Sequence, residues 1–290
     1  MLCCLHIDEL EYLVTTLKYW MRSLLLAALA AYVVSAIHSV LAFVNKRLAL
    51  QRVADWAMAT GFVFHTTALV ADWFVDGHYP LFYLRETLSF LAWTTVGSYA
   101  LVRYRYGAHA LGSLTLPAVS LLVFLALLIG SPGGPQELGI SGTWLFPVHT
   151  TLLLFAYAAF FVVFVASLMY LVQERELKLK TFSAIFHRLP SLTTLNEIAT
   201  SAAAIGLAFL TIGIATGMLW SSSRYGGLWH NDPKEIFALL TWLLYLLLIV
   251  YRSTAHWRGR RAAWLGVAGF VLVLCTFFGA RWMGGYHVFG

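Results

Sequence analysis

The sequence predicts an all-α protein, a polytopic bundle of about eight transmembrane helices. Composition is the first reason, because 60% of the 290 residues are hydrophobic and only 11% are charged, whereas soluble domains contain about 25% charged residues. The second reason is that apolar runs of roughly 20 residues, long enough to cross a bilayer, recur along the chain. We expect residues 1–22 to form an N-terminal external segment and residues 23–290 to form a single integral membrane domain.

The eight expected spans follow one another without an internal repeat or a low-complexity linker. In chain order, the apolar runs cover residues 23–44, 54–74, 87–102, 114–129, 148–171, 199–220, 236–251 and 263–280.

Basic residues set the expected orientation of these spans. They concentrate in the loops after the first, third, fifth and seventh spans: Lys46, Arg47, Arg52, Arg103, Arg105, Arg175, Lys178, Lys180, Arg188, Arg252, Arg258, Arg260 and Arg261. Because positive loops face the cytoplasm, both termini and the loop near Trp229 are expected on the external, periplasmic side of a bacterial-type plasma membrane. Lys18 and Arg22, just before the first span, argue for the opposite orientation.

The net charge of +6 is therefore interpreted as topology, and no nucleic-acid partner is expected. The cysteines indicate whether the chain itself could carry covalently attached haem. The chain contains Cys3, Cys4 and Cys275 and no C-x-x-C-H sequence, so it is not expected to carry covalently attached c-type haem.

The segment 220–235, WSSSRYGGLWHNDPKE, is polar, aromatic and rich in glycine between two apolar runs. It resembles the tryptophan-rich WWD loop of the cytochrome c assembly family of the CcsA/ResC type, which is close to W-x-x-x-x-W-G-x-x-W-x-W-D-P-K-E. The following positions match without a gap: Trp220, Gly226, Trp229 and 232–235. The following replace tryptophans of that pattern: Tyr225, Asn231 and Phe237.

Structural explanations exist for the same residues. Asp232, Pro233 and Glu235 fit the N-cap, N1 and N3 positions of a capping box at the start of the seventh span. Tryptophans near a span end are also typical of interfacial aromatic belts. The capping role is compatible with a function for the preceding loop.

Two histidines are expected on the same side as Trp229. His149 lies just inside the outer end of the fifth span, and His287 lies just past the eighth. Imidazole is a common axial ligand of haem iron, and in the family one histidine before the tryptophan-rich loop and one after it are external haem ligands. The alternative is that both are interfacial histidines with an amphipathic role.

Ionisable groups inside a bilayer are functional candidates by default. His65 lies in the middle of the second span and His38 in the inner half of the first. A neutral histidine hydrogen-bonded to a neighbouring helix is the alternative for both. The family has a transmembrane haem-ligand histidine, and counting back from Trp257 places Val250 at that position, with Tyr251 and His256 as the nearest substitutes.

Two further stretches resemble the family. Residues 77–93 match a pattern close to G-H-x-P-x-x-N-x-x-E-S-L-x-F-x-x-W, and residues 257–263 match its basic W-R-G-R-R loop. In the alternative interpretation, His78 is an exposed loop histidine, Arg85 and Glu86 start the third span, and the basic loop anchors the chain to anionic lipid.

The resemblance implies haem handling, export and presentation for attachment to apocytochrome c, as a subunit of a cytochrome c haem-lyase complex. It implies non-covalent haem b, a CcsB/ResB-type membrane partner and an apocytochrome c with a C-x-x-C-H site. The implied haem-binding residues are His149, His287, Trp220, Tyr225, Gly226, Trp229 and Asp232, with His65 as a further candidate. Two other functions stay open: a haem-binding regulator without ligation activity, and a small-molecule transporter that uses intramembrane histidines.

Overall fold

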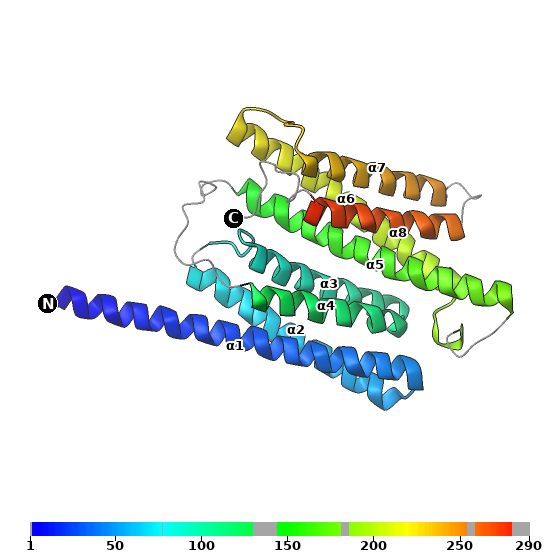
Figure 1. Ribbon diagram of the computed structural model, residues 1–290, viewed down its shortest axis with the longest axis horizontal. Helices are drawn as coiled ribbons and strands as arrows, with labels where there is room; N and C mark the ends of the chain where they lie inside the picture. The colour runs from blue at the N-terminus through cyan, green and yellow to red at the C-terminus, as the bar shows by residue number, and fades with distance from the viewer. Residues whose placement is uncertain (1, 77, 130–143, 181–185, 254–258, 280–290) are drawn as a thin grey trace. The chain divides into compact units, whose positions relative to one another are not determined.

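A computed structural model describes residues 2–76, 78–129, 144–180, 186–253 and 259–279. Within these ranges the chain forms eight α-helices and no strand, which confirms the all-α prediction (Figure 1). The helices are α1 Leu2–Asn45, α2 Leu48–Asp76, α3 Leu84–Tyr106, α4 Gly112–Leu128, α5 Leu145–Leu179, α6 Leu192–Tyr225, α7 Pro233–Ser253 and α8 Arg260–Leu274.

Seven of these helices are long and apolar enough to cross a membrane, and α3 is the exception. At 23 residues, α3 is about 34 Å long, which matches a bilayer core. Its sequence is less apolar because charged residues stand at both ends, including Glu86, Arg103 and Arg105, and hydroxyl side chains lie between them. Ser89, Thr94 and Thr95 are buried. Thr94 and Thr95 both donate to the carbonyl oxygen of Leu91. These two hydroxyl groups are therefore turned inward and hydrogen-bonded within the helix.

The chain divides into two compact units. Unit 1 comprises residues 1–96 and 116–131, and unit 2 comprises residues 97–115 and 132–290. The boundary predicted at residue 22 falls inside the continuous helix α1. The assignment of residues 23–290 to one membrane domain stays a prediction.

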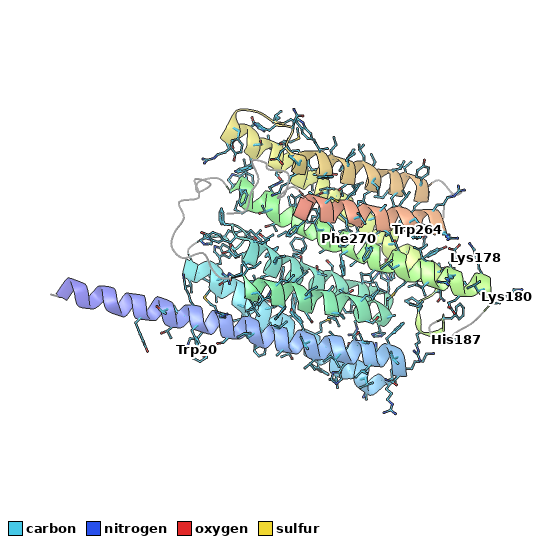
Figure 2. All side chains as sticks on the ribbon, in the orientation of Figure 1. Trp20, Lys178, Lys180, His187, Trp264 and Phe270 are labelled. Atoms are coloured by element: carbon cyan, nitrogen blue, oxygen red, sulfur yellow. The ribbon has the colours of Figure 1, made fainter. Side chains whose placement is uncertain are left out.

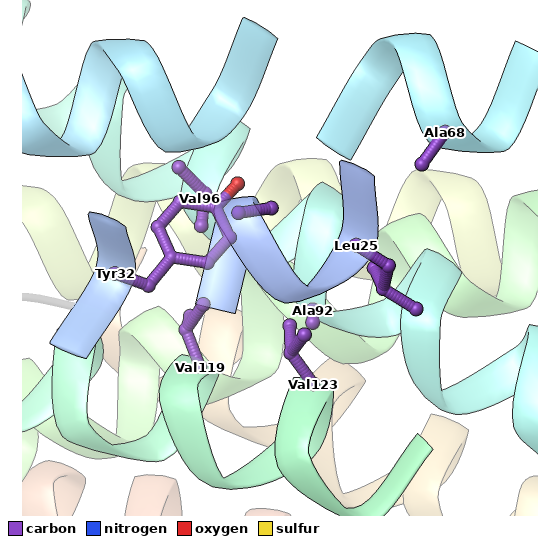
Figure 3. Packing of buried hydrophobic residues seen from close by; sticks show 8 residues of the cluster. Leu25, Tyr32, Ala68, Ala92, Val96, Val119 and Val123 are labelled. Carbon is purple, nitrogen blue, oxygen red and sulfur yellow. The ribbon is translucent and has the colours of Figure 1, made fainter. Parts of the chain in front are cut away.

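Unit 1 is built on small and branched side chains from four helices. Its apolar cluster consists of Leu25, Ala28, Tyr32, Ala68, Ala92, Val96, Val119 and Val123, all buried (Figure 3). Alanines at these contacts let the helix backbones approach closely, as is usual where lipid supplies no hydrophobic driving force between helices. Tyr32, the largest member of this cluster, is fully buried.

Unit 2 is organised around α5, which packs mainly against α6 and α8 (Figure 1). Gly206 of α6 lies against the ring of Phe160, where any Cβ would overlap that ring. Phe160 also stacks on Tyr245 of α7, with ring centroids 3.6 Å apart. Phe164 of α5 stacks in the same way on Phe270 of α8. Aromatic rings and glycines thus fix the spacing of these helices.

Basic side chains gather at the C-terminal end of α5. Figure 2 shows Lys178, Lys180 and His187 at this end, opposite to the end at which α6 joins α7. Lys178 forms an ion pair with Glu174 one turn earlier at 2.7 Å. This distribution agrees with the basic loops of the sequence, and the assignment of that end to the cytoplasm stays a prediction.

Candidate functional site

The segment 220–235 joins α6 to α7 within unit 2. Helix α6 ends where Gly226 adopts a left-handed conformation with φ of 75° and donates its N–H to the carbonyl of Ser222. Glycine adopts this conformation without a steric penalty and is the usual residue at a helix C-terminus. The glycine that matches the family pattern is therefore also the residue that ends α6 and turns the chain.

Helix α7 begins with the predicted capping box. Asp232 is buried, and its Oδ1 accepts the backbone N–H of Lys234 at 2.9 Å. Glu235 reaches back, so that its Oε2 accepts the N–H of Asp232 at 3.3 Å and that of His230 at 2.9 Å. Asp232 thus satisfies a backbone donor of the first helical turn, and Glu235 satisfies those of the N-cap residue and of the loop before it. The cap thereby fixes the conformation of the loop before α7 as well as the start of α7.

His149 lies in the second turn of α5 and points at α6. Its Nδ1 donates to the backbone carbonyl of Gly213 across a distance of 2.6 Å. Its ring lies on Gly217, where a Cβ would come within 2.4 Å of the ring carbon Cε1. Gly213 and Gly217 form a G-x-x-x-G pair, a spacing that lets helices pack at close range. This pair creates the space that the imidazole occupies.

The hydrogen bond to Gly213 determines the tautomer of His149. Because a carbonyl oxygen only accepts, Nδ1 must carry the proton, and the lone pair of the ring then lies on Nε2. Metal-ligating histidines usually donate their other ring N–H to a carbonyl or a carboxylate in this way. The orientation and the tautomer of His149 therefore fit an axial ligand of haem iron.

A row of aromatic rings extends from α5 into the loop. Phe146 contacts Trp220 with ring centroids 5.3 Å apart, Trp220 contacts Tyr225 edge to face at 5.9 Å, and Tyr225 contacts His230 at 5.6 Å. Nδ1 of His230 lies 3.0 Å from the hydroxyl of Ser221 and 3.8 Å from the Glu235 carboxylate. Trp220 is buried while Tyr225 is 42% exposed, so the row leads from the interior to the surface.

Trp229 presents its ring at the surface of the loop. It is 39% exposed, and its indole Nε1 donates to the Oδ1 of Asn231 at 2.8 Å. Asn231 has a positive φ of 56°, a conformation that asparagine tolerates better than a bulky residue. In this chain Asn231 therefore turns the backbone and holds the neighbouring indole.

Comparisons with known proteins show the family of this chain. A family model described as cytochrome C assembly protein matches residues 81–287, which is more than half of the chain. The chain belongs to this family. The match contains His149, the 220–235 segment and both helices of the G-x-x-x-G contact.

Curated relatives of this cytochrome c assembly protein include the "Cytochrome c biogenesis protein CcsA" of Guillardia theta, 28% identical over 246 residues that cover 78% of this chain and 81% of the relative. The protein of the same name from Synechococcus sp. is 27% identical over 251 residues, covering 78% and 82%. Among solved structures, "Cytochrome c Heme Lyase CcmF" superposes with a TM-score of 0.64 at 17% identity, covering 93% of this chain and 49% of that chain. This likeness shows a shared fold, and the chain spans about half the length of that protein.

The structure describes only some of the remaining predicted residues of this cytochrome c assembly protein. His287 lies outside the described residues. His65 belongs to unit 1, where its ring is fully buried, with Nδ1 3.3 Å from the Tyr32 hydroxyl and Nε2 2.9 Å from that of Ser89. This is the arrangement of the structural alternative, a histidine bonded to neighbouring helices. Val250 is 49% exposed on α7, and His256 lies outside the described part of the chain.

Sequence reasoning did not identify three contributors to the site. Gly213 and Gly217 position His149, and the G-x-x-x-G spacing was a readable signal for them. Phe146 begins the aromatic row, and nothing in its local sequence distinguishes it from the many other phenylalanines.

The motif histidine His78 lies in unit 1, where its ring contacts Phe82 and Tyr83 edge to face.

Proposed function

We propose that this cytochrome c assembly protein binds haem where the N-terminal end of α5 lies beside the C-terminal end of α6. It then presents the haem for attachment to apocytochrome c. The observation that carries the proposal is the geometry of His149. Its Nδ1–H donates to the Gly213 carbonyl, and its Nε2 carries the lone pair. One turn earlier on the same helix, Phe146 contacts Trp220, which in turn contacts Tyr225.

Each residue then has a physical role. Nε2 of His149 would bind the haem iron, and the predicted second ligand is His287. Tyr225 and Trp229 expose flat rings that suit the apolar face of a porphyrin. The cap made by Asp232 and Glu235 holds the loop in place, which reduces the entropy that a mobile loop would lose on binding.

In the attachment reaction itself, the groups that react are those of the haem and of the apocytochrome thiols. Bound haem would supply its vinyl groups, across which each cysteine S–H of a C-x-x-C-H site would add: the S–H bond breaks, one S–C bond forms and the proton ends on the other vinyl carbon. No external oxidant is consumed in this addition. The proposed task of the protein is to hold non-covalent haem b in position, with a CcsB/ResB-type membrane protein as the proposed partner.

The seven apolar helices and the family make this chain an integral membrane protein. We further propose that the α6–α7 loop and both termini face the periplasm of a bacterial-type plasma membrane. The support is the concentration of basic residues at the opposite end of unit 2. A cysteine accessibility assay on intact cells should label a cysteine introduced at Leu228, and a cysteine introduced at Lys180 only after permeabilisation. Labelling of both in intact cells would contradict this orientation.

The central experiment is the visible absorption spectrum of the purified protein and its His149→Ala variant. Wild type is expected to show a Soret band of six-coordinate, low-spin haem. The variant should retain less haem and shift away from the low-spin form, and added imidazole should restore part of the signal because it fits the space that alanine leaves. The matched control is His187→Ala, an exposed histidine at the other end of unit 2.

His287→Ala tests the second ligand in the same assay. If both histidines bind one iron, the losses in the double variant should be non-additive. Wild-type spectra and haem content for both single variants would refute the site, and His230 would be the first replacement to test. Small independent losses of stability without imidazole rescue would instead support an interfacial role.

A haem-binding regulator without ligation activity is the second candidate. The observation that favours it is Val250, which occupies the position of the family's transmembrane ligand and cannot bind iron. Val250→His should increase the haem retained on purification if that inner site exists. Formation of covalent cytochrome c when the chain is co-expressed with an apocytochrome and the partner would exclude the regulator, and haem binding without product would favour it.

A further inference from the structure

A cavity of about 330 Å³ lies in unit 1, separate from the haem site proposed in unit 2. It opens where the first half of α1 meets the C-terminal part of α2, the start of α3 and the end of α4. Its polar lining comes from Lys18, Arg22, Asp72 and Arg85, and its apolar lining includes Leu25 and Leu127. The volume is at the lower end of the range typical of ligand pockets.

The cavity carries an excess of positive charge. Three of its lining side chains are cationic and one is a carboxylate. Arg85 lies 3.4 Å from Asp72 and 4.0 Å from Glu86, with side chains that are mostly buried. Its Nε is also buried and makes no hydrogen bond to any residue that the structure describes. Lys18 and Arg22, one helical turn apart, present two more charges on the same face of α1. The electrostatics of the cavity therefore favour an anion.

The floor of the cavity is apolar. Leu25 belongs to the buried cluster of unit 1, and Leu127 packs against that cluster. Met21 also lines the cavity and is 7% exposed. A ligand that matches both parts must combine an anionic group with a hydrocarbon portion.

Aromatic residues indicate the depth of the cavity in the membrane. Tyr19 lines it and is 71% exposed, and the neighbouring Trp20 is 61% exposed and projects from the outer face of α1 (Figure 2). Tyrosine and tryptophan concentrate at the headgroup level of a bilayer. The cationic lining thus lies where lipid phosphates are found.

We propose that this cavity is a binding site for an anionic phospholipid, whose phosphate contacts Arg22, Lys18 and Arg85 and whose first acyl carbons contact Leu25 and Leu127. Haem propionates would supply a similar charge, but the lining contains no imidazole to bind iron. The site also explains Lys18 and Arg22, the two basic residues that stand at the wrong end of the first span for the predicted orientation. They serve a ligand there and do not set the topology.

The test is a titration of the full-length purified protein in neutral detergent, with bound lipid measured by native mass spectrometry. The probes are phosphatidylglycerol, zwitterionic phosphatidylcholine and haem. Phosphatidylglycerol should bind more tightly than phosphatidylcholine. Arg22→Gln should weaken phosphatidylglycerol binding roughly fivefold, since a basic residue near an anionic headgroup contributes about a factor of this size.

Two variants make the result specific. Arg224→Gln removes an exposed arginine of α6 in unit 2 and should leave lipid binding unchanged. Asp72→Asn removes the carboxylate of the lining and should strengthen phosphatidylglycerol binding, the opposite direction from Arg22→Gln and a direction that misfolding does not produce.

Equal binding of the two lipids, or an Arg22→Gln variant that binds like wild type, would overturn the proposal. Competition between haem and phosphatidylglycerol, with haem content lowered by Arg22→Gln, would assign the cavity to haem propionates and would also overturn it. Loss of the His149 spectrum would leave this lipid result unaffected, so the two proposals fail independently.

Discussion

His65 and His149 are both histidines on apolar helices, and the structure uses them differently. His65 lies inside unit 1, where both ring nitrogens meet hydroxyl groups, from Tyr32 of α1 and Ser89 of α3. His149 lies near the end of α5, where Nδ1 meets a backbone carbonyl of α6. A hydroxyl can donate or accept, so it fixes no tautomer, whereas a carbonyl fixes the lone pair on Nε2. The first arrangement joins three helices, and the second joins two and leaves the ring lone pair on Nε2, as the proposed haem ligation requires.

The largest effect on stability is expected for His65→Ala. The change leaves a cavity in a packed core and removes the partner of two buried hydroxyl groups, which together cost about 3 kcal/mol. The thermal midpoint of the purified protein should fall markedly, while the haem bound per folded molecule should stay at the wild-type value. A loss of haem without a loss of stability would show that His65 is a ligand, and the contrast drawn between His65 and His149 would then be wrong.

Gly217→Ala keeps His149 in the chain but should displace its imidazole ring, so it tests whether the position of the ring matters for haem binding. A Cβ at this site would lie 2.4 Å from Cε1 and 2.6 Å from Nδ1 of the ring, so the imidazole must move. Overpacking of this kind costs about 1–3 kcal/mol, and we expect reduced haem retention and a perturbed Soret band. The matched control is Gly206→Ala on the same helix, whose Cβ would overlap the ring of Phe160 and so overpacks the α5–α6 contact without touching His149. Equal spectra for wild type and Gly217→Ala would contradict the assigned role of this contact.

Asp232→Ala tests whether the helix cap supports the site. Loss of the N-cap should cost about 1 kcal/mol of stability and loosen the loop that carries Trp229 and His230. Asp232→Asn keeps a side-chain oxygen that can accept the Lys234 N–H and should behave nearly as wild type. The measurement is haem affinity by titration together with the thermal midpoint. If alanine and asparagine lower haem affinity equally with little change in stability, the charge of Asp232 acts on the ligand directly.

The smallest expected effect concerns Glu86, a buried polar group just before the third predicted span. Burial raises the pKa of its carboxyl above the ordinary value of 4.5, while His78, Arg85 and the backbone N–H groups of Tyr83 and Phe82 lower it. A carboxyl with a raised folded-state pKa stabilises the fold below its unfolded-state pKa, and this contribution is lost as the pH rises through the folded-state value.

Glu86→Gln should therefore flatten the fall in thermal midpoint as the pH rises above about 4.5. The amide oxygen of glutamine can still accept the N–H of Phe82, which Glu86 binds at 3.0 Å, so the local turn should persist. A steeper pH dependence in the variant would show that Arg85 and the backbone groups outweigh the effect of burial.

Much of the secondary structure could be predicted from the sequence, because helices and their caps depend on interactions between residues that are close in the chain. Hydrophobic runs predict the helices, and all eight occur among the described residues. Asp232 and Glu235 predict the cap of α7, since a capping box involves only neighbours three residues apart. Gly226 likewise ends α6 through its own backbone conformation. The resemblance of the 220–235 segment and residues 77–93 identified the family without any tertiary information.

Contacts between distant segments were decided only by the tertiary structure. No local signal shows that Gly213 would meet the ring of His149, that Tyr32 and Ser89 would occupy the nitrogens of His65, or that Arg85 would share a cavity with Arg22. Each depends on which face of one helix turns toward another, and that is set by packing of side chains separated by tens of residues. The sequence by itself determined the helices, their ends and the family, while close packing decided which groups the ring nitrogens of each histidine meet.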